Sequence, residues 1–545
     1  MKADMILKSQ AVFRGIIAEP SESFVAIKGN RIIYVGDVGR MHEYLREDTV
    51  VYDFGNKLIM PGLHDAHIHM YMSSMYASPY IKVIKKSRSE EQCVAELKEL
   101  VEKERDLESE RWLIGTGWYH PQWENPKLPT KASLDAAFGN RPVCMVSRDC
   151  HTMWFNSAGL LKVGISKGGT PPEGGTYDYL ENGELSGIVH EAATFALNAE
   201  VYTFPQNEEL DCYRKFIRQL NAYGITSVCD VSMMPGEGLD FVRNDIYEKL
   251  LETKELTVRV NMYPTLGANL DRPLKMREKY TGQVLRCTGV KQFQDGVSSC
   301  HTAYLKEDYA NAHFPGDRGK TTIPVESMRK MILHATENDF SVRVHAIGDQ
   351  AIHELLDIFE EAEKRYGRKP YLQHTLEHLE NFQPEDIGRL AKTHVLPSVQ
   401  PPHVLIDTIG VERDLGSERV KDMWPFKRMA DAGSTLAFGT DSPCVDVNPF
   451  YGIYNAVTRQ SVFDGEPKGG WLPMEKITLA EALSFYTYGS ACAASMEHDT
   501  GTLAPGKLAD IAVLDRNLFA VVPEQIPDTK VVMTIMDGKI VYQSE

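Results

Sequence analysis

The chain has 545 residues, enough for several average domains or for one α/β barrel with large insertions. Its apolar content of 43% and charged content of 25% are typical of a soluble globular enzyme and exclude extended disorder. The formal charge of −17 argues against a nucleic-acid or membrane partner, because such partners need clustered Lys and Arg. A small-molecule substrate is compatible with this composition.

The cysteines and the N-terminus indicate a reducing compartment. The nine cysteines are scattered, odd in number and without a Cys-x-x-Cys pair, which predicts reduced thiols rather than a disulfide framework. The first residues contain no long apolar stretch with a small-residue cleavage site, and no run approaches 18 apolar residues. We therefore expect a cytoplasmic protein.

Both ends of the chain are rich in short strand patterns. Apolar runs alternate between residues 5 and 37, with the turn pair Gly29-Asn30, and recur at 507–514 and 531–542, with the turn pair Asp537-Gly538. This predicts that residues 1–56 and 491–545 build one small β-sandwich domain. The alternative is two independent edge sheets.

Residues 57–490 alternate strand-like runs with amphipathic helix patterns, which is typical of βα units and a parallel sheet. One such helix is expected at 350–366, with an apolar stripe and Asp349 as its cap. Eight strands with intervening helices predict a (β/α)8 TIM-type barrel, whose functional groups lie at the strands' C-terminal ends. The expected strands are 58–70, 226–232, 258–266, 289–295, 341–345, 371–378, 394–400 and 435–441.

A long segment, 71–209, separates the first two expected strands and is too large for a loop. We expect an insertion that forms a lid over the barrel's top face. Trp118, Asp149 and His151 are its candidate substrate-binding residues, although buried aromatics and capping groups are equally common readings. Trp123 and Trp154 add a hint of an apolar or aromatic substrate.

His67 and His69 stand out in the segment Lys57 to Tyr71. In an extended strand, residues i and i+2 point to the same face, so both imidazoles can reach one metal ion. An isolated His-x-His is more often two histidines on a half-exposed strand, so the metal interpretation depends on further ligands at later strand ends.

Further candidate ligands do recur at the ends of later strands, where they can converge on one rim. Histidine suits Zn²⁺ or a similar ion, an aspartate can act as ligand and proton acceptor, and a lysine there has to be deprotonated or carboxylated. These residues are Lys291, His345, His378 and Asp441.

One rival motif is His374-Thr-Leu-Glu-His378, which fits the H-x-x-E-H signature of a metallopeptidase when it lies on a helix. The run is short and lies between Pro370 and Pro384, so a strand is the better prediction.

The chain resembles the amidohydrolase superfamily, and within it amidohydrolase family 3, which includes N-substituted formamide deformylases. The resemblance covers nearly the whole chain, in the family's order. It rests on the segments Pro61–His69, Gly289–Gly296, His345–Asp349, Glu377–His378, Gly439–Asp441 and Gly501–Asp510.

The resemblance implies a metal-carrying barrel with a small β domain. It further implies that Lys291 is a carboxylated, metal-bridging lysine, that His345 and His378 bind a second ion, and that Asp441 is the acid/base. Asp295, His313 and His403 are substrate-side candidates, and family habit favours a homodimer.

The expected function is therefore hydrolysis of a non-peptide C–N bond by hydroxide generated at one or two divalent metal ions, with zinc as the first choice. A bound Zn²⁺ brings the pKa of water from 15.7 to about 7, which an ordinary carboxylate cannot achieve. A lactonase or other ester hydrolase, the H-x-x-E-H metallopeptidase and a catalytically silent barrel scaffold are the alternatives.

Overall fold

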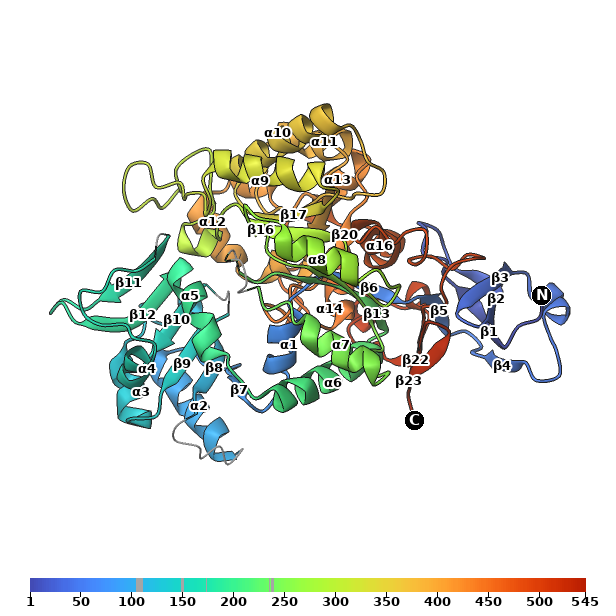
Figure 1. Cartoon of the computed structure of the whole chain (residues 1–545), viewed down its shortest axis with the longest axis horizontal. Helices are drawn as coiled ribbons and strands as arrows, with labels where there is room; N and C mark the ends of the chain where they lie inside the picture. Colours follow the sequence, from blue (N-terminus) through green and yellow to red (C-terminus); the bar gives the residue numbers. More distant parts are fainter. Residues whose placement is uncertain (104–110, 149–150, 173, 235, 237–239) are drawn as a thin grey trace. The chain divides into compact units, whose positions relative to one another are not determined.

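The structure is a computed structural model that describes residues 1–103, 111–148, 151–172, 174–234, 236 and 240–545 (Figure 1). The chain divides into two compact units, one made of residues 1–70 and 216–545 and the other of residues 71–215. Among the described residues no helix is both long and apolar enough to cross a membrane. Eight cysteines lie within those residues, and all are free thiols.

The two ends of the chain contribute to one sheet, as expected. Its order is β23-β22-β21-β5-β1-β2-β3. β4 pairs with residues 5–8 of β1, beside the part of β1 that pairs with β5. Figure 1 shows the blue N-terminal and red C-terminal strands at one end of the first unit. Hydrogen bonds link all eight strands into one sheet, whereas the sequence predicted a β-sandwich. The strands are β1 (Met5–Val12), β2 (Ser21–Lys28), β3 (Arg31–Gly36), β4 (Val50–Asp53), β5 (Leu58–Pro61), β21 (Ile511–Leu514), β22 (Val531–Met536) and β23 (Lys539–Gln543).

The strand alternation explains how this sheet holds both ends together. Leu7 packs with Val25, Ile59, Ile511 and Ile535 in one buried cluster, whereas the next residue, Ile6, packs with Phe24 in another. The burial of apolar side chains from both ends stabilises the pairing of segments about 500 residues apart in sequence.

The prediction of a single strand at 58–70 is wrong, because this segment forms two strands that belong to two different sheets. β5 ends at Pro61 and pairs with β21, whereas β6 (Leu63–Ile68) pairs with β13 (Ile225–Val231). Gly62 lies between them, and a Cβ atom there would collide with the Thr226 side chain. A residue without a side chain therefore lets the chain pass closely between the sheets.

The remaining strands of the first unit form two parallel sheets. One has the order β15-β14-β13-β6 and the other runs β16-β17-β18-β19-β20. They contain all eight expected strand positions, and β15 is an additional short strand. The bounds are β14 (Arg259–Tyr263), β15 (Leu285–Cys287), β16 (Gly289–Phe293), β17 (Ser341–Ala346), β18 (Thr375–His378), β19 (Leu396–Val399) and β20 (Ala437–Phe438).

Backbone hydrogen bonds connect these two sheets on both sides. Beyond β14, the Lys291 N–H donates to the Pro264 carbonyl (2.9 Å) and the Leu266 N–H donates to the Lys291 carbonyl (2.8 Å). Beyond β20, the Asp441 N–H donates to the His67 carbonyl (2.7 Å). The C-terminal end of β20 is thus held beside the C-terminal end of β6.

Helices follow the strands along the chain. The expected helix at 350–366 is α10 (Asp349–Tyr366), and its expected stripe, including Leu355 and Phe359, is buried. The predicted cap is wrong, because Gly348 is the N-cap and Asp349 is the first helical residue. The other helices of this part are α6 (Gln206–Ala222), α7 (Asn244–Glu252), α8 (Asp271–Lys279), α9 (Val325–Glu337), α11 (Pro384–Lys392), α12 (Thr408–Leu415), α13 (Phe426–Asp431), α14 (Pro449–Thr458), α15 (Leu479–Ser484) and α16 (Ser490–Ala493).

The second unit has its own six-stranded sheet, in the order β11-β12-β10-β9-β8-β7, and its own core around Trp118 and Trp154. Its elements are α1 (Met70–Tyr76), β7 (Ile81–Val83), α2 (Glu90–Lys103), β8 (Leu113–Trp118), α3 (Lys131–Phe138), β9 (Val143–Ser147), β10 (Thr152–Phe155), α4 (Ser157–Lys162), β11 (Gly175–Tyr179), β12 (Leu185–Glu191) and α5 (Ala192–Val201).

Candidate metal centre

The predicted ligands come together at the C-terminal ends of the parallel strands. His67 is the penultimate residue of β6, and His69 follows that strand directly. His378 ends β18, and Asp441 follows β20 by three residues. One ligand atom from each of His67, His378 and Asp441 lies within 4.8 Å of the others, and all three residues are buried. His345 joins them, because its ring centroid is 4.5 Å from that of His378.

Each of the four histidines has one ring nitrogen paired with an oxygen acceptor. His67 Nδ1 lies 2.6 Å from Glu377 Oε2, His69 Nδ1 is 3.0 Å from the Val231 carbonyl, and His378 Nδ1 is 2.9 Å from Gln400 Oε1. His345 instead uses Nε2, 3.1 Å from the Gly296 carbonyl. Because these oxygens only accept, the paired nitrogen carries the proton and the other keeps its lone pair. This is the usual arrangement of histidines that ligate metals.

Asp441 faces two of those lone pairs. Its Oδ1 lies 3.0 Å from His69 Nε2 and 3.4 Å from His67 Nε2. With the protons on the two Nδ1 atoms, three acceptors face one another without a hydrogen between them. His67 Nε2 and Asp441 Oδ1 are buried and have no hydrogen-bond partner among the described residues. A cation between them satisfies all three, so this arrangement fits a divalent metal ion.

The protonation states also suit metal ligation. Burial lowers the pKa of His67 to about 4, although the neighbouring Glu377 acts to raise it. Burial, with His345 beside it, likewise holds the pKa of His378 well below its usual value. Burial acts to raise the pKa of Asp441, but the adjacent histidines outweigh that effect and keep it well below its ordinary value. Neutral imidazoles and an ionised carboxylate are the ligand forms that metals require.

Lys291 is completely buried, and its Nζ atom has no hydrogen-bond partner among the described residues. Burial lowers its pKa to about 8, against the opposing effect of Glu377 and Asp441. An amine with that pKa is partly neutral at physiological pH, and it is nucleophilic in that form.

Three buried residues that support the site were not recognised as such from the sequence, namely Glu377, Arg343 and Asp65. Glu377 holds His67 with Oε2 and accepts from Arg343 Nη1 with Oε1 (3.2 Å). Burial acts to raise the pKa of Glu377, but Arg343 and His67 lower it to about 2. Both side chains are completely buried. The only signal in the sequence was the position of Glu377 beside His378, which the resemblance already included.

Asp65, which the sequence analysis also missed, supports the site by orienting the backbone. Its Oδ1 accepts from the N–H groups of His67 (3.1 Å) and Thr440 (3.0 Å), and thereby joins β6 to the segment that carries Asp441. Burial raises the pKa of Asp65 to about 7.

Backbone strain marks two of the candidate ligands. His378 has φ of 73° and Asp441 has φ of 57°, both in the left-handed region that non-glycine residues rarely adopt. Such conformations cost about 1–3 kcal/mol each and concentrate at functional sites. They turn these side chains away from the direction that a regular strand would give them.

The three substrate-side candidates lie in different surroundings. His403 joins the cluster, because its Nε2 is 3.6 Å from Asp441 Oδ2 and its ring stacks on His378 with centroids 5.9 Å apart. Asp295 has an anchoring role, with its oxygens accepting from the backbone N–H groups of Tyr304, Ile347 and Gly348.

His313 lies in another cluster. Its side chain is 70% exposed beside Asp317, and its ring stacks on His301.

The candidates of the second unit are less informative. Trp118 is 1% exposed, packs against Trp154 and donates from Nε1 to the Met145 carbonyl, which gives it a packing role. His151 pairs with Glu191 at 2.8 Å. Asp149 lies outside the described residues. Substrate contacts by these residues stay predictions.

The helical H-x-x-E-H reading is wrong. Thr375–His378 is strand β18, so the helical geometry on which that peptidase motif depends is absent. His374 instead accepts from the Val342 N–H (3.1 Å) and packs against Phe359 of α10.

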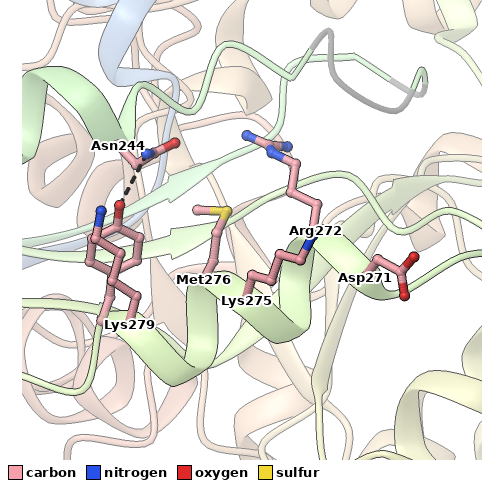
Figure 2. Close-up of a pocket in the computed structure, with 7 residues that line it drawn as sticks. Asn244, Asp271, Arg272, Lys275, Met276 and Lys279 are labelled. Atoms are coloured by element: carbon pink, nitrogen blue, oxygen red, sulfur yellow. Dashed lines mark hydrogen bonds between the residues drawn. The ribbon is translucent and has the colours of Figure 1, made fainter.

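A hollow of about 450 Å³ lies along α8 beside the start of α7, and Figure 2 shows its basic side chains. Two of them have acidic partners, Arg272 with Asp240 and Lys279 with Glu248. None of the candidate ligands lines it, so it is not the metal centre. Its lining is Asn244, Asp271, Arg272, Lys275, Met276, Lys279 and Tyr280.

Known proteins are similar to this chain in sequence and in fold. The sequence model of the amidohydrolase family matches residues 50–542. YtcJ of Bacillus subtilis (strain 168) is 30% identical over 519 residues, 93% of each chain. The N-substituted formamide deformylase of Arthrobacter pascens is 24% identical over 532 residues, 95% of this chain and 94% of that one. An uncharacterized metal-dependent hydrolase from Pyrococcus horikoshii OT3 is 25% identical with a TM-score of 0.74, over 95% of this chain and 99% of the other.

Proposed function

The chain belongs to amidohydrolase family 3, and we propose on that basis that it is a metal-dependent hydrolase of a non-peptide carbon–nitrogen bond. The observation that carries this proposal is the buried group of facing acceptors formed by Asp441 Oδ1 and the Nε2 atoms of His67 and His69. The amide class is supported by the likeness to the N-substituted formamide deformylase.

The proposed architecture is a (β/α)8 barrel made of β6, β13, β14 and β16 to β20. It is supported by the backbone hydrogen bonds that join the two parallel sheets near Pro264 and His67. In this proposal residues 57–490 form the barrel, residues 71–209 its insertion, and residues 1–56 with 491–545 the small β domain.

The proposed ligands form two sets. His67, His69 and Asp441 would hold one ion, and His345 and His378 would hold a second. Lys291 would contribute to both as a carbamate, which forms when its neutral amine adds to CO₂ and loses one proton. When bound, a divalent ion such as Zn²⁺ lowers the pKa of water from 15.7 to about 7 and polarises a substrate carbonyl.

The protein's own residues then manage protons and orientation. Asp441 directs Oδ1 toward His69 and Oδ2 toward His403, so its carboxylate would accept a proton and pass it to the leaving nitrogen. Glu377 keeps the His67 proton on Nδ1 and so preserves the lone pair on Nε2. His403, buried and with a lowered pKa, is placed to donate a hydrogen bond to a substrate oxygen.

The first test is metal content per chain, together with intact mass under non-denaturing conditions. We expect about two equivalents and the added mass of one CO₂, with both falling in Lys291→Ala. A single equivalent that does not depend on Lys291 would contradict the bridged pair, and a protein that cannot be loaded would overturn the metal proposal.

The second test is turnover on matched amides and esters that carry the same acyl group. We expect amide hydrolysis that Asp441→Asn and His67→Ala abolish while the chain stays folded. His64→Ala is the control, because His64 is equally buried in β6 but contacts Cys229 Sγ instead of the cluster. Ester turnover without amide turnover would replace the C–N assignment with a lactonase or esterase.

A further inference from the structure

A second group of metal-binding side chains lies in the long loop after β16. His301, His313 and Asp317 each offer a ligand atom within 4.8 Å of the other two. His301 Nδ1 is 2.8 Å from Asp317 Oδ2, and His313 Nδ1 is 3.6 Å from the same oxygen. We propose that these three residues form a separate site for a divalent transition-metal ion, with Zn²⁺ as the first probe. This site is additional to the proposed centre and shares none of its ligands.

The chemistry of the donors favours a metal such as zinc over calcium or magnesium. Two imidazoles and one carboxylate suit zinc and its neighbours in the first transition series, whereas calcium and magnesium prefer oxygen donors alone. The Asp317 side chain is 5% exposed. Burial acts to raise its pKa, but the His313 N–H and the His301 ring outweigh that and lower it, so the carboxylate is anionic.

The separations lie close to those of a bound ion. Ligand atoms about 2.0–2.1 Å from a tetrahedral zinc lie about 3.3 Å from one another. The 2.8 Å contact between His301 Nδ1 and Asp317 Oδ2 is a hydrogen bond, so an ion that binds Nδ1 must displace its proton and open the pair by about half an ångström. The His313 pair at 3.6 Å must close slightly.

Binding of an ion requires one of the two imidazole rings to turn. His301 and His313 are stacked with centroids 4.3 Å apart and planes 7° apart, so an ion cannot lie in both ring planes at once. The other face of His301 stacks on Tyr309 at 4.1 Å, and its side chain is 10% exposed, so this ring is held. His313 is 70% exposed and is the ring that can turn to complete the site.

The loop itself is already folded around the site. The His313 N–H donates to Asp317 Oδ2 (2.8 Å), and the Tyr309 N–H donates to the Asp317 carbonyl (2.8 Å). Gly319 packs so closely on the Ala303 carbonyl that a Cβ atom would collide with it. An ion here therefore orders one side chain rather than a whole loop, which reduces the entropy cost of binding.

The test uses full-length protein whose principal centre has been loaded first. Equilibrium dialysis against micromolar free Zn²⁺, followed by elemental analysis, counts the additional equivalents. We expect wild type to bind one more equivalent than His313→Ala, which should fold normally because the side chain is exposed. His498→Ala is the matched control, since His498 is 95% exposed beside Glu497 and should keep the extra equivalent.

Asp317→Asn supplies a second variant that retains side-chain volume, and it should also lose the extra equivalent. Equal binding by wild type and His313→Ala would overturn the site, as would loss of the equivalent in His498→Ala alone. Metal content of the principal centre is read in the same samples, so failure of the two proposals can be distinguished.

Discussion

Glu377→Gln gives the sharpest test of how the protein orients its proposed metal ligands. The substitution keeps the side-chain volume but removes a charge that pairs with Arg343 and fixes the proton of His67. The amide can offer one oxygen, so its NH₂ group must face either the His67 N–H or the guanidinium. One buried donor is then left without an acceptor.

Two magnitudes follow. The pKa of Glu377 falls from 4.5 to about 2 on folding, which corresponds to about 3 kcal/mol at 1.36 kcal/mol per unit. Because the folded pKa is the lower one, this stabilisation is fully present above pH 4.5 and is lost as the pH falls toward 2. Breaking a buried ion pair costs about 3–5 kcal/mol, so at pH 7 we expect a loss of about 3 kcal/mol. Loss of a ligand-orienting partner should weaken metal binding about 10–100-fold.

The assays are denaturant unfolding of metal-free protein and Zn²⁺ affinity by competition with a chelator. Glu475→Gln is the matched control, because Glu475 is also completely buried and pairs with Arg428 at 2.5 Å, without contact to a candidate ligand. We expect both variants to lose stability but only Glu377→Gln to lose metal affinity. Metal affinity within twofold of wild type in Glu377→Gln would refute the role of Glu377 in holding His67.

Three further outcomes are expected. His374 has a pKa lowered to about 4 by burial, so its stabilising contribution is present above pH 6.5 and lost as the pH falls through 4. His374→Gln, whose amide oxygen can still accept from the Val342 N–H, should therefore reduce the loss of unfolding free energy between pH 7 and 4.5 by about 2 kcal/mol, and an unchanged loss would contradict this. Gly62→Ala should lower stability by about 1–3 kcal/mol through its collision with Thr226, and Thr226→Ala should recover part of that loss; simple additivity in the double variant would argue against the collision. Removal of metal with a chelator should lower the Tm of wild type more than that of a His67→Ala, Asp441→Asn double variant, and equal shifts in a thermal scan would place the stabilising ion elsewhere.

The sequence alone determined the parts of the site that depend on local rules. Two histidines separated by one residue on a strand share a face, and parallel strands present their C-terminal ends on one side. Those rules were enough to bring His67, His378 and Asp441 together, and the family was recognisable from the same residues. The eight strand positions followed from periodic apolar runs between turn residues.

The tertiary structure decided what depends on contacts between distant segments. Glu377 holds His67 across 310 residues of sequence, and no local pattern encodes that pairing. The burial of Trp118 among other aromatic side chains was also beyond the sequence, because a side chain's exposure depends on what folds over it. The division of the first strand at Gly62 likewise reflects the close approach of Thr226 on a strand more than 150 residues away. The candidate ligands could thus be recognised from the local sequence, whereas the orientation and burial of each side chain come from its neighbours in space.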